Sequence, residues 1–207
     1  MKGSRKTGMP EVMKAWLEDA NVDWRPEYPF NESRVRNAVR KSLLKEQRGL
    51  CLYCGVQLDT SMPGDTFHIE HFIPQSISKA DAINYNNLFL SCGTKNKQGK
   101  PSPTCGNARK NWYHETDHVK PEYPDCVSRF RFLLTGKVVP AVPNDTAAQN
   151  MIDNMKLNHA ELVIARRDVF DLIDSGAMTV EDYYDDESGI AESYAHIVYL
   201  HFDEVLP

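Results

Sequence analysis

The chain has 207 residues, a formal net charge of −5 and five cysteines. This length can bury a real core and fits either one domain with an appended lobe or two small domains. The basic start is not followed by an apolar signal segment, and no run approaches the roughly 18 apolar residues of a membrane span. We therefore expect a soluble cytoplasmic protein.

The charge is unevenly distributed along the chain. All 24 Lys and Arg lie in residues 1–167, whereas residues 168–207 hold eleven Asp and Glu and no Lys or Arg. The first part can therefore face the phosphates of a nucleic acid, and the last part cannot.

Residues 1–49 are expected to form an N-terminal helical segment. Pro10 precedes a stripe of apolar residues that includes Met13 and Trp16, a pattern typical of a first helix. Asn31 is a plausible N-cap for a second helix that ends near Gly49. The basic residues of this second helix either follow a phosphate backbone or form a solvated charged face; they are Arg34, Arg36, Arg40, Lys41, Lys45 and Arg48.

Four of the five cysteines lie within residues 50–125, the expected central core. Cys51 and Cys54 form a Cys-x-x-Cys turn, and Cys92 and Cys105 are separated by a loop rich in Gly, Pro and Lys. We favour a four-thiolate zinc site over a site that lacks one of these ligands and over four unrelated thiols. Such a closed tetrahedron would be structural. Cys126 is left over.

Between the cysteine pairs, residues 67–74 have the pattern of a strand end that carries Glu70 and His71. Adjacent residues of an extended chain point to opposite sides, so we expect a bend before Pro74 that lets both reach one cleft. A second strand is expected after Asn87. His68 either faces away from this cleft or supports it.

Residues 126–207 are expected to form a β-hairpin followed by a helical, acidic lobe. Residues 129–139 read as two short strands joined at a Gly, and helices are expected over 147–157 and 160–173. A last helix should carry Ile190, Tyr194 and Ile197. This acidic and aromatic end either binds a protein partner or is a solvated surface.

The central stretch resembles the HNH endonucleases, also known as the ββα-metal or His-Me finger fold. The resemblance rests on Glu-His-Phe-Ile-Pro at residues 70–74, on Asn87, and on an Asn followed three residues later by a Lys at 107–110. It implies an α+β protein with a zinc-stapled ββα-metal core. By position, it implies His71 as general base, Glu70 and Asn107 as ligands of a catalytic divalent ion, and Asn87 as the residue that braces the loop behind His71. A Gly inserted before Asn107 leaves open whether Asn111 or His114 joins the metal site.

More broadly, residues 35–170 resemble the HNH subunit of Septu-type anti-phage systems (PtuB), which also occurs beside retrons and works with an ABC-like ATPase. This wider resemblance implies the nuclease effector of a bacterial defence system. We expect the acidic lobe from Asp168 onward to dock the ATPase.

The chemistry agrees with this resemblance. Hydrolysis of a phosphodiester needs a deprotonated water and a cation that absorbs the developing charge. A neutral imidazole supplies the first, and Mg²⁺ or Mn²⁺ on oxygen ligands supplies the second, apart from the sulfur-bound zinc. The basic residues near the cleft are expected to contact DNA or RNA phosphates: Lys95, Lys97, Lys100, Arg109 and Lys110. The alternative is a non-catalytic, zinc-stabilised module that binds nucleic acid or protein.

Overall fold

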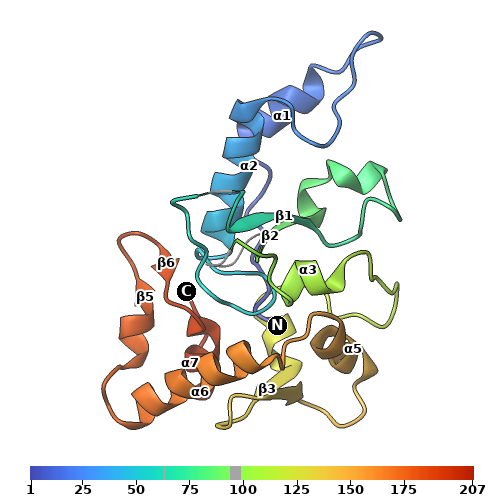
Figure 1. Cartoon of the computed structure of the whole chain (residues 1–207). Coiled ribbons are helices and arrows are strands. Elements are labelled where there is room, and N and C mark those ends of the chain that lie inside the picture. The colour runs from blue at the N-terminus through green and yellow to red at the C-terminus, as the bar shows by residue number, and fades with distance from the viewer. Residues whose placement is uncertain (63, 94–98) are drawn as a thin grey trace.

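The computed structural model of the chain describes residues 1–62, 64–93 and 99–207. It has the α+β fold that the sequence predicts: small antiparallel two-stranded sheets embedded among helices (Figure 1). No helix in the described ranges is long and apolar enough to span a bilayer.

Helices α1 (Glu11–Glu18) and α2 (Ser33–Glu46) form an arm above the central sheet (Figure 1). Helix α2 buries Val35, Val39 and Leu43, which follow one another every four residues on its inner face. The expected Asn31 cap is wrong: Glu32 occupies the N-cap position, and its side chain makes no capping hydrogen bond.

The central unit is a ββα arrangement. Strands β1 (Phe67–His71) and β2 (Leu88–Cys92) pair antiparallel, and the connection between them holds two 3₁₀ turns, η1 (Ala80–Ala82) and η2 (Tyr85–Asn87). Helix α3 (Cys105–Arg109) follows the second strand.

Helix α3 is shorter than the sequence indicates. It ends at Lys110, whose φ of +53° is incompatible with continuing a right-handed helix. Asn111 and His114, which the sequence left open as metal ligands, therefore lie beyond the end of this helix. His114 is exposed and accepts hydrogen bonds from the backbone N–H groups of the turn at Thr116 and Asp117.

A buried glutamine ties α2 to the central sheet. The Gln47 side chain accepts from the Leu90 N–H at 2.7 Å and donates to the carbonyls of Leu50 and Leu90 at 2.7 and 2.9 Å. It is fully buried. Among the described residues no strand pairs with β2 on this side, so the side-chain amide and the Leu52 N–H, which donates to the Leu90 carbonyl at 3.0 Å, satisfy this edge. The glutamine thereby fixes the arm against the sheet.

The C-terminal third contains the expected hairpin and helices. Strands β3 (Phe130–Phe132) and β4 (Val138–Pro140) pair across a turn with Gly136 at φ +82°. The remaining elements are α4 (Asp125–Ser128), α5 (Thr146–Asn154), α6 (Ala160–Asp174), η3 (Val180–Tyr183), β5 (Tyr184–Asp185), β6 (Ile190–Ala191) and α7 (Ala195–His201). Ile190 lies in β6, so the last helix is shorter than predicted.

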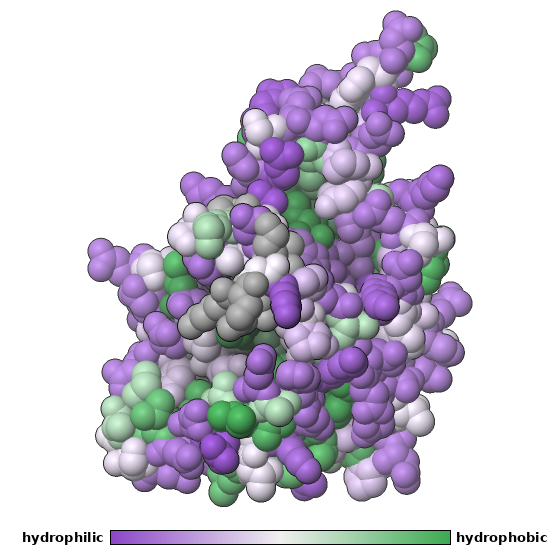
Figure 2. Space-filling view, viewed as in Figure 1, coloured by the Kyte–Doolittle hydropathy of each residue, from purple (hydrophilic) through white to green (hydrophobic). Residues whose placement is uncertain are grey.

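The main hydrophobic cluster extends from the N-terminal segment to α6 and includes Met13, Phe67 and Met151. It thus continues across the expected boundaries at residues 49 and 125. A second cluster packs α6 against α7 and includes Phe170 and Val198. The face in Figure 2 is mostly hydrophilic, with apolar side chains gathered near its lower edge, in the region of α6.

Candidate active site

The four expected cysteines converge in space. Their sulfur atoms all lie within 4.8 Å of one another, and none is in a disulfide. Around one zinc ion with Zn–S bonds of about 2.3 Å, tetrahedral geometry places the sulfur atoms about 3.8 Å apart. The Cys54 and Cys92 sulfurs are 3.6 Å apart, so the donor set and its spacing fit a structural Zn²⁺.

The cysteine cluster joins three parts of the chain. Cys51 and Cys54 lie in a turn that Gly55 completes at φ +77°, Cys92 ends β2, and Cys105 begins α3. The Cys105 N–H also donates to the Met155 carbonyl at 2.9 Å, which ties α3 to the end of α5. A zinc ion here would hold α3 against the β1–β2 sheet.

Glu70 is buried on the face of β1 that points toward α3. Its Oε1 accepts from the Tyr53 hydroxyl at 2.9 Å and lies 3.4 Å from Arg109 Nε, while its Oε2 lies 3.1 Å from His68 Nε2. Burial raises the pKa of Glu70, but the hydrogen bond from His68 and the charge of Arg109 outweigh it and leave the pKa below its usual value. Glu70 is therefore a carboxylate at neutral pH.

The atoms Glu70 Oε2 and His68 Nε2 face a cradle beside Gly106, at the position that a side chain there would occupy. A Cβ added at Gly106 would lie 2.7 Å from Glu70 Oε2 and 3.0 Å from His68 Nε2, so only glycine leaves this space free. Two ligands bound at right angles to one ion at about 2.1 Å lie about 3 Å apart. With His68 in the tautomer that leaves Nε2 unprotonated, these oxygen and nitrogen donors fit a small divalent cation.

His71 lies on the other face of β1. Its Nε2 is 3.0 Å from the Ala82 carbonyl oxygen, which can only accept, so Nε2 carries the proton and Nδ1 is a free base. The exposed Gln75 amide nitrogen is 3.3 Å from Nδ1. The Tyr28 ring packs edge-on against the imidazole, with centroids 4.4 Å apart. Burial lowers the pKa of His71 below 6.5, so the ring is neutral at pH 7.

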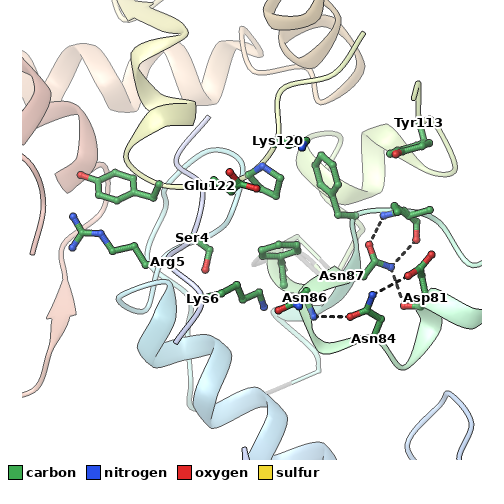
Figure 3. A pocket seen from close by; sticks show the side chains of 15 residues that line it. Ser4, Arg5, Lys6, Asp81, Asn84, Asn86, Asn87, Tyr113, Lys120 and Glu122 are labelled. Carbon is green, nitrogen blue, oxygen red and sulfur yellow. Dashed lines mark hydrogen bonds between the residues drawn. The ribbon is translucent and has the colours of Figure 1, made fainter. Parts of the chain in front are cut away.

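Asn87 ties together the loop that holds the imidazole. Its Oδ1 accepts from the Ile73 N–H at 2.6 Å, and its Nδ2 donates to the carbonyls of Ile73 and Asp81 at 3.0 Å each (Figure 3). Since Asp81 immediately precedes Ala82, these bonds fix the carbonyl that orients His71. Asn87 therefore contacts the loop behind the imidazole, and its part in the reaction stays a prediction of the resemblance.

The chain bends at Phe72 and Ile73, just before Pro74 as expected, but this bend follows both Glu70 and His71 and does not bring their side chains to one side. Strand β1 pairs regularly with β2 through His71, so the two side chains point to opposite faces of the strand end. This arrangement suits in-line displacement, in which the attacking and leaving oxygens lie on opposite sides of phosphorus. A phosphate at the strand end would meet the base on one side and the carboxylate on the other.

Residues 51–105 match the family model of the HNH endonuclease. These residues form an HNH endonuclease domain. No curated protein matches the chain. An HNH endonuclease hydrolyses phosphodiester bonds in nucleic acid, so the chain is a phosphodiester hydrolase with nucleic acid as its class of substrate. The match begins and ends at the cysteine cluster and encloses Glu70, His71 and Asn87.

Within the HNH domain, Arg109 differs from its expected role in phosphate binding. It is only 4 % exposed. Its guanidinium donates to the carbonyls of His71 and Phe72 at 2.8 and 2.9 Å and to the Tyr53 hydroxyl at 2.9 Å, beside its ion pair with Glu70. Arg109 is thus committed to holding the strand end.

Two of the four lysines expected to bind nucleic acid lie within the described residues. Lys100 and Lys110 are exposed, whereas Lys95 and Lys97 lie outside the described residues. Lys6 and Lys120, which the sequence did not single out, line a surface pocket whose other wall includes Asn87 (Figure 3).

Among the described residues, no hydrogen bond joins Asn107 to Glu70. The Asn107 amide nitrogen donates to the Gly93 carbonyl, and His68 is the residue in contact with Glu70 Oε2. The sequence left open whether His68 faces away from the Glu70 cleft or supports it, and in the structure it contacts Glu70. Alternation along β1 could have indicated this, because residues 68 and 70 share a face. No sequence signal pointed to Tyr28 or Tyr53.

Proposed function

We propose that the chain is a metal-dependent endonuclease that cuts DNA or RNA at the C-terminal end of β1. The observation that carries this proposal is the state of His71: the Ala82 carbonyl holds its proton on Nε2, which leaves Nδ1 unprotonated, while the Glu70 carboxylate lies buried on the opposite face of the same strand end. A histidine that only filled space would not need this fixed orientation.

In the proposed reaction, His71 Nδ1 removes the proton from the attacking water, and Gln75 Nε2 lies close enough to help place that water. Asn87 keeps the Ala82 carbonyl in position, which stabilises the imidazolium that forms. Glu70 and His68 would hold a Mg²⁺ or Mn²⁺, which supplies charge stabilisation at the leaving oxygen. Asn107 joins as a further ligand only if its amide leaves Gly93.

The test is a cleavage assay on plasmid, single-stranded DNA and total RNA with purified full-length chain. We expect cleavage of at least one substrate with Mg²⁺ or Mn²⁺, and complete loss with a chelator that leaves the zinc in place. Tight binding to every substrate without cleavage at any metal concentration would instead favour the non-catalytic binding module.

We further propose that this nuclease is the effector of an anti-phage system and acts with an ABC-like ATPase. The support is the wider sequence resemblance and the character of the surface: the C-terminal lobe is acidic and exposes the apolar side chains of Leu172, Ile190 and Phe202. Exposed apolar groups within a charged surface are typical of protein interfaces. If the ATPase did not co-purify with the full chain, the partner would be excluded while the nuclease assignment would stand.

A further inference from the structure

An arginine pair on α2 lies outside the HNH domain and on the His71 side of β1. Arg36 and Arg40 are one helical turn apart and therefore neighbours on the helix surface. Both are half-buried, and neither forms an ion pair with a carboxylate of the described residues. By contrast, Arg34 on the same helix is exposed and paired with Glu32 at 2.6 Å.

A short chain of contacts connects this pair to the base. Arg36 Nη1 donates to the Phe30 carbonyl at 3.2 Å, the Phe30 ring is 5.3 Å from the Tyr28 ring, and the Tyr28 ring is 4.4 Å from His71. Burial raises the pKa of Tyr28 above its usual value. The charges of Arg40 and Arg36 oppose this rise, so both guanidinium groups lie close enough to act on the Tyr28 hydroxyl.

Arg40 lacks the partners that a half-buried arginine normally has. Its Nε is inaccessible to solvent and has no hydrogen-bond acceptor within the part of the chain that the structure describes, and its Nη2 lies close to Gly64. Burial lowers the pKa of Arg40, and the nearby Arg36 charge lowers it further. Two unneutralised arginines side by side cost stability, and an anion between them would remove that cost.

We propose that Arg36 and Arg40 form a clamp for a phosphate of the nucleic-acid strand next to His71, with Tyr28 as the spacer between clamp and base. The guanidinium fork matches two phosphate oxygens at once, which fixes orientation as well as charge. This inference rests on the proposed nuclease function and adds to it a substrate-positioning element from the N-terminal segment. The two arginines are positioning residues that hold the strand for attack.

The first test measures binding without cleavage, using the full chain with His71→Ala as parent. In that parent, Arg36→Gln with Arg40→Gln should weaken binding of the nucleic acid that the wild-type chain cleaves. The magnitude of the slope of log affinity against log salt should fall by about 1 to 2, because one or two phosphate contacts are lost. Arg34→Gln is the matched control and should keep the parent slope. The double Lys variant should keep the slope but lose part of the affinity, because charge remains without the fork.

The second test uses inorganic phosphate at constant ionic strength and does not require nuclease activity. Phosphate should raise the melting temperature of the parent and of Arg34→Gln more than that of the double Gln variant. Zinc content and helicity confirm that each variant is folded. A loss in either measurement that Arg34→Gln does not share supports the clamp. If parent and double Gln variant behave identically in both measurements, the clamp is overturned, even if the protein is a nuclease. If the chain binds phosphate through the clamp but cleaves no nucleic acid, only the nuclease assignment is overturned.

Discussion

Replacing His71 with alanine should reduce phosphodiester cleavage by about 10²- to 10⁴-fold, the usual contribution of a general base. The loss follows from the geometry, because Nδ1 is the unprotonated ring nitrogen and Ala82 holds the other one. Single-turnover cleavage of the substrate found in the metal assay, at saturating Mg²⁺ or Mn²⁺, measures the effect.

The matched control is His114→Ala, which removes an exposed histidine after α3 and should leave cleavage near wild type. Zinc content and the melting curve of His71→Ala should remain close to wild type.

The pH profile of cleavage adds a second check on His71. Since burial lowers the pKa of His71 below 6.5, the base is free at pH 7, and cleavage should decline only as pH falls below about 6.5. Full activity of His71→Ala would remove His71 from the reaction.

Removing one sulfur ligand should unfold the central core. Cys105→Ser is expected to abolish zinc binding and to leave the chain largely unfolded or aggregated, because structural zinc contributes an apparent binding free energy of about 10–16 kcal/mol in zinc-finger peptides. Cys105 is the ligand that attaches α3 and, through Met155, α5 to the sheet. Elemental analysis should give about one zinc per wild-type chain, and circular dichroism reports the loss of structure.

Cys126→Ser tests whether the loss of zinc and fold is specific to the four clustered cysteines. Cys126 is equally buried but lies apart from the four converging sulfurs, with its thiol donating to the Lys2 carbonyl at 3.4 Å. A serine hydroxyl can make the same bond, so this variant should keep its zinc and its fold. Zinc loss in Cys126→Ser, or full zinc retention in Cys105→Ser, would contradict the four-thiolate assignment.

The α+β fold and the metal clamp could be predicted because both depend on local or compositional signals. Apolar residues recur at helical spacing in α1, α2 and α6, and thiols are rare enough that four within one stretch indicate a shared ion. The loop between Cys92 and Cys105 did not obscure this signal, because a loop rich in Gly and Pro lets its ends meet.

The errors concern contacts that depend on tertiary packing. Arg109 looks like a surface phosphate binder because sequence does not distinguish a buried arginine from an exposed one, yet the carbonyls of His71 and Phe72 need donors at the strand end. The bend before Pro74 was expected to bring the Glu70 and His71 side chains to one cleft, but it lies at Phe72 and Ile73, and regular pairing with β2 continues through His71. Tyr28 lies in a connector without periodicity, so its contact with His71, 43 residues later in the chain, left no local signal.

The position of a bound Mn²⁺ tests the central claim most directly. Crystals of the His71→Ala chain soaked in Mn²⁺ should show an anomalous peak within coordination distance of Glu70 Oε2, in the cradle beside Gly106, in addition to the zinc peak at the four sulfurs. Glu70→Ala should remove the manganese peak and keep the zinc peak. An empty cradle at saturating Mn²⁺, or a manganese ion bound away from Glu70, would contradict a metal-dependent nuclease centred on the end of β1.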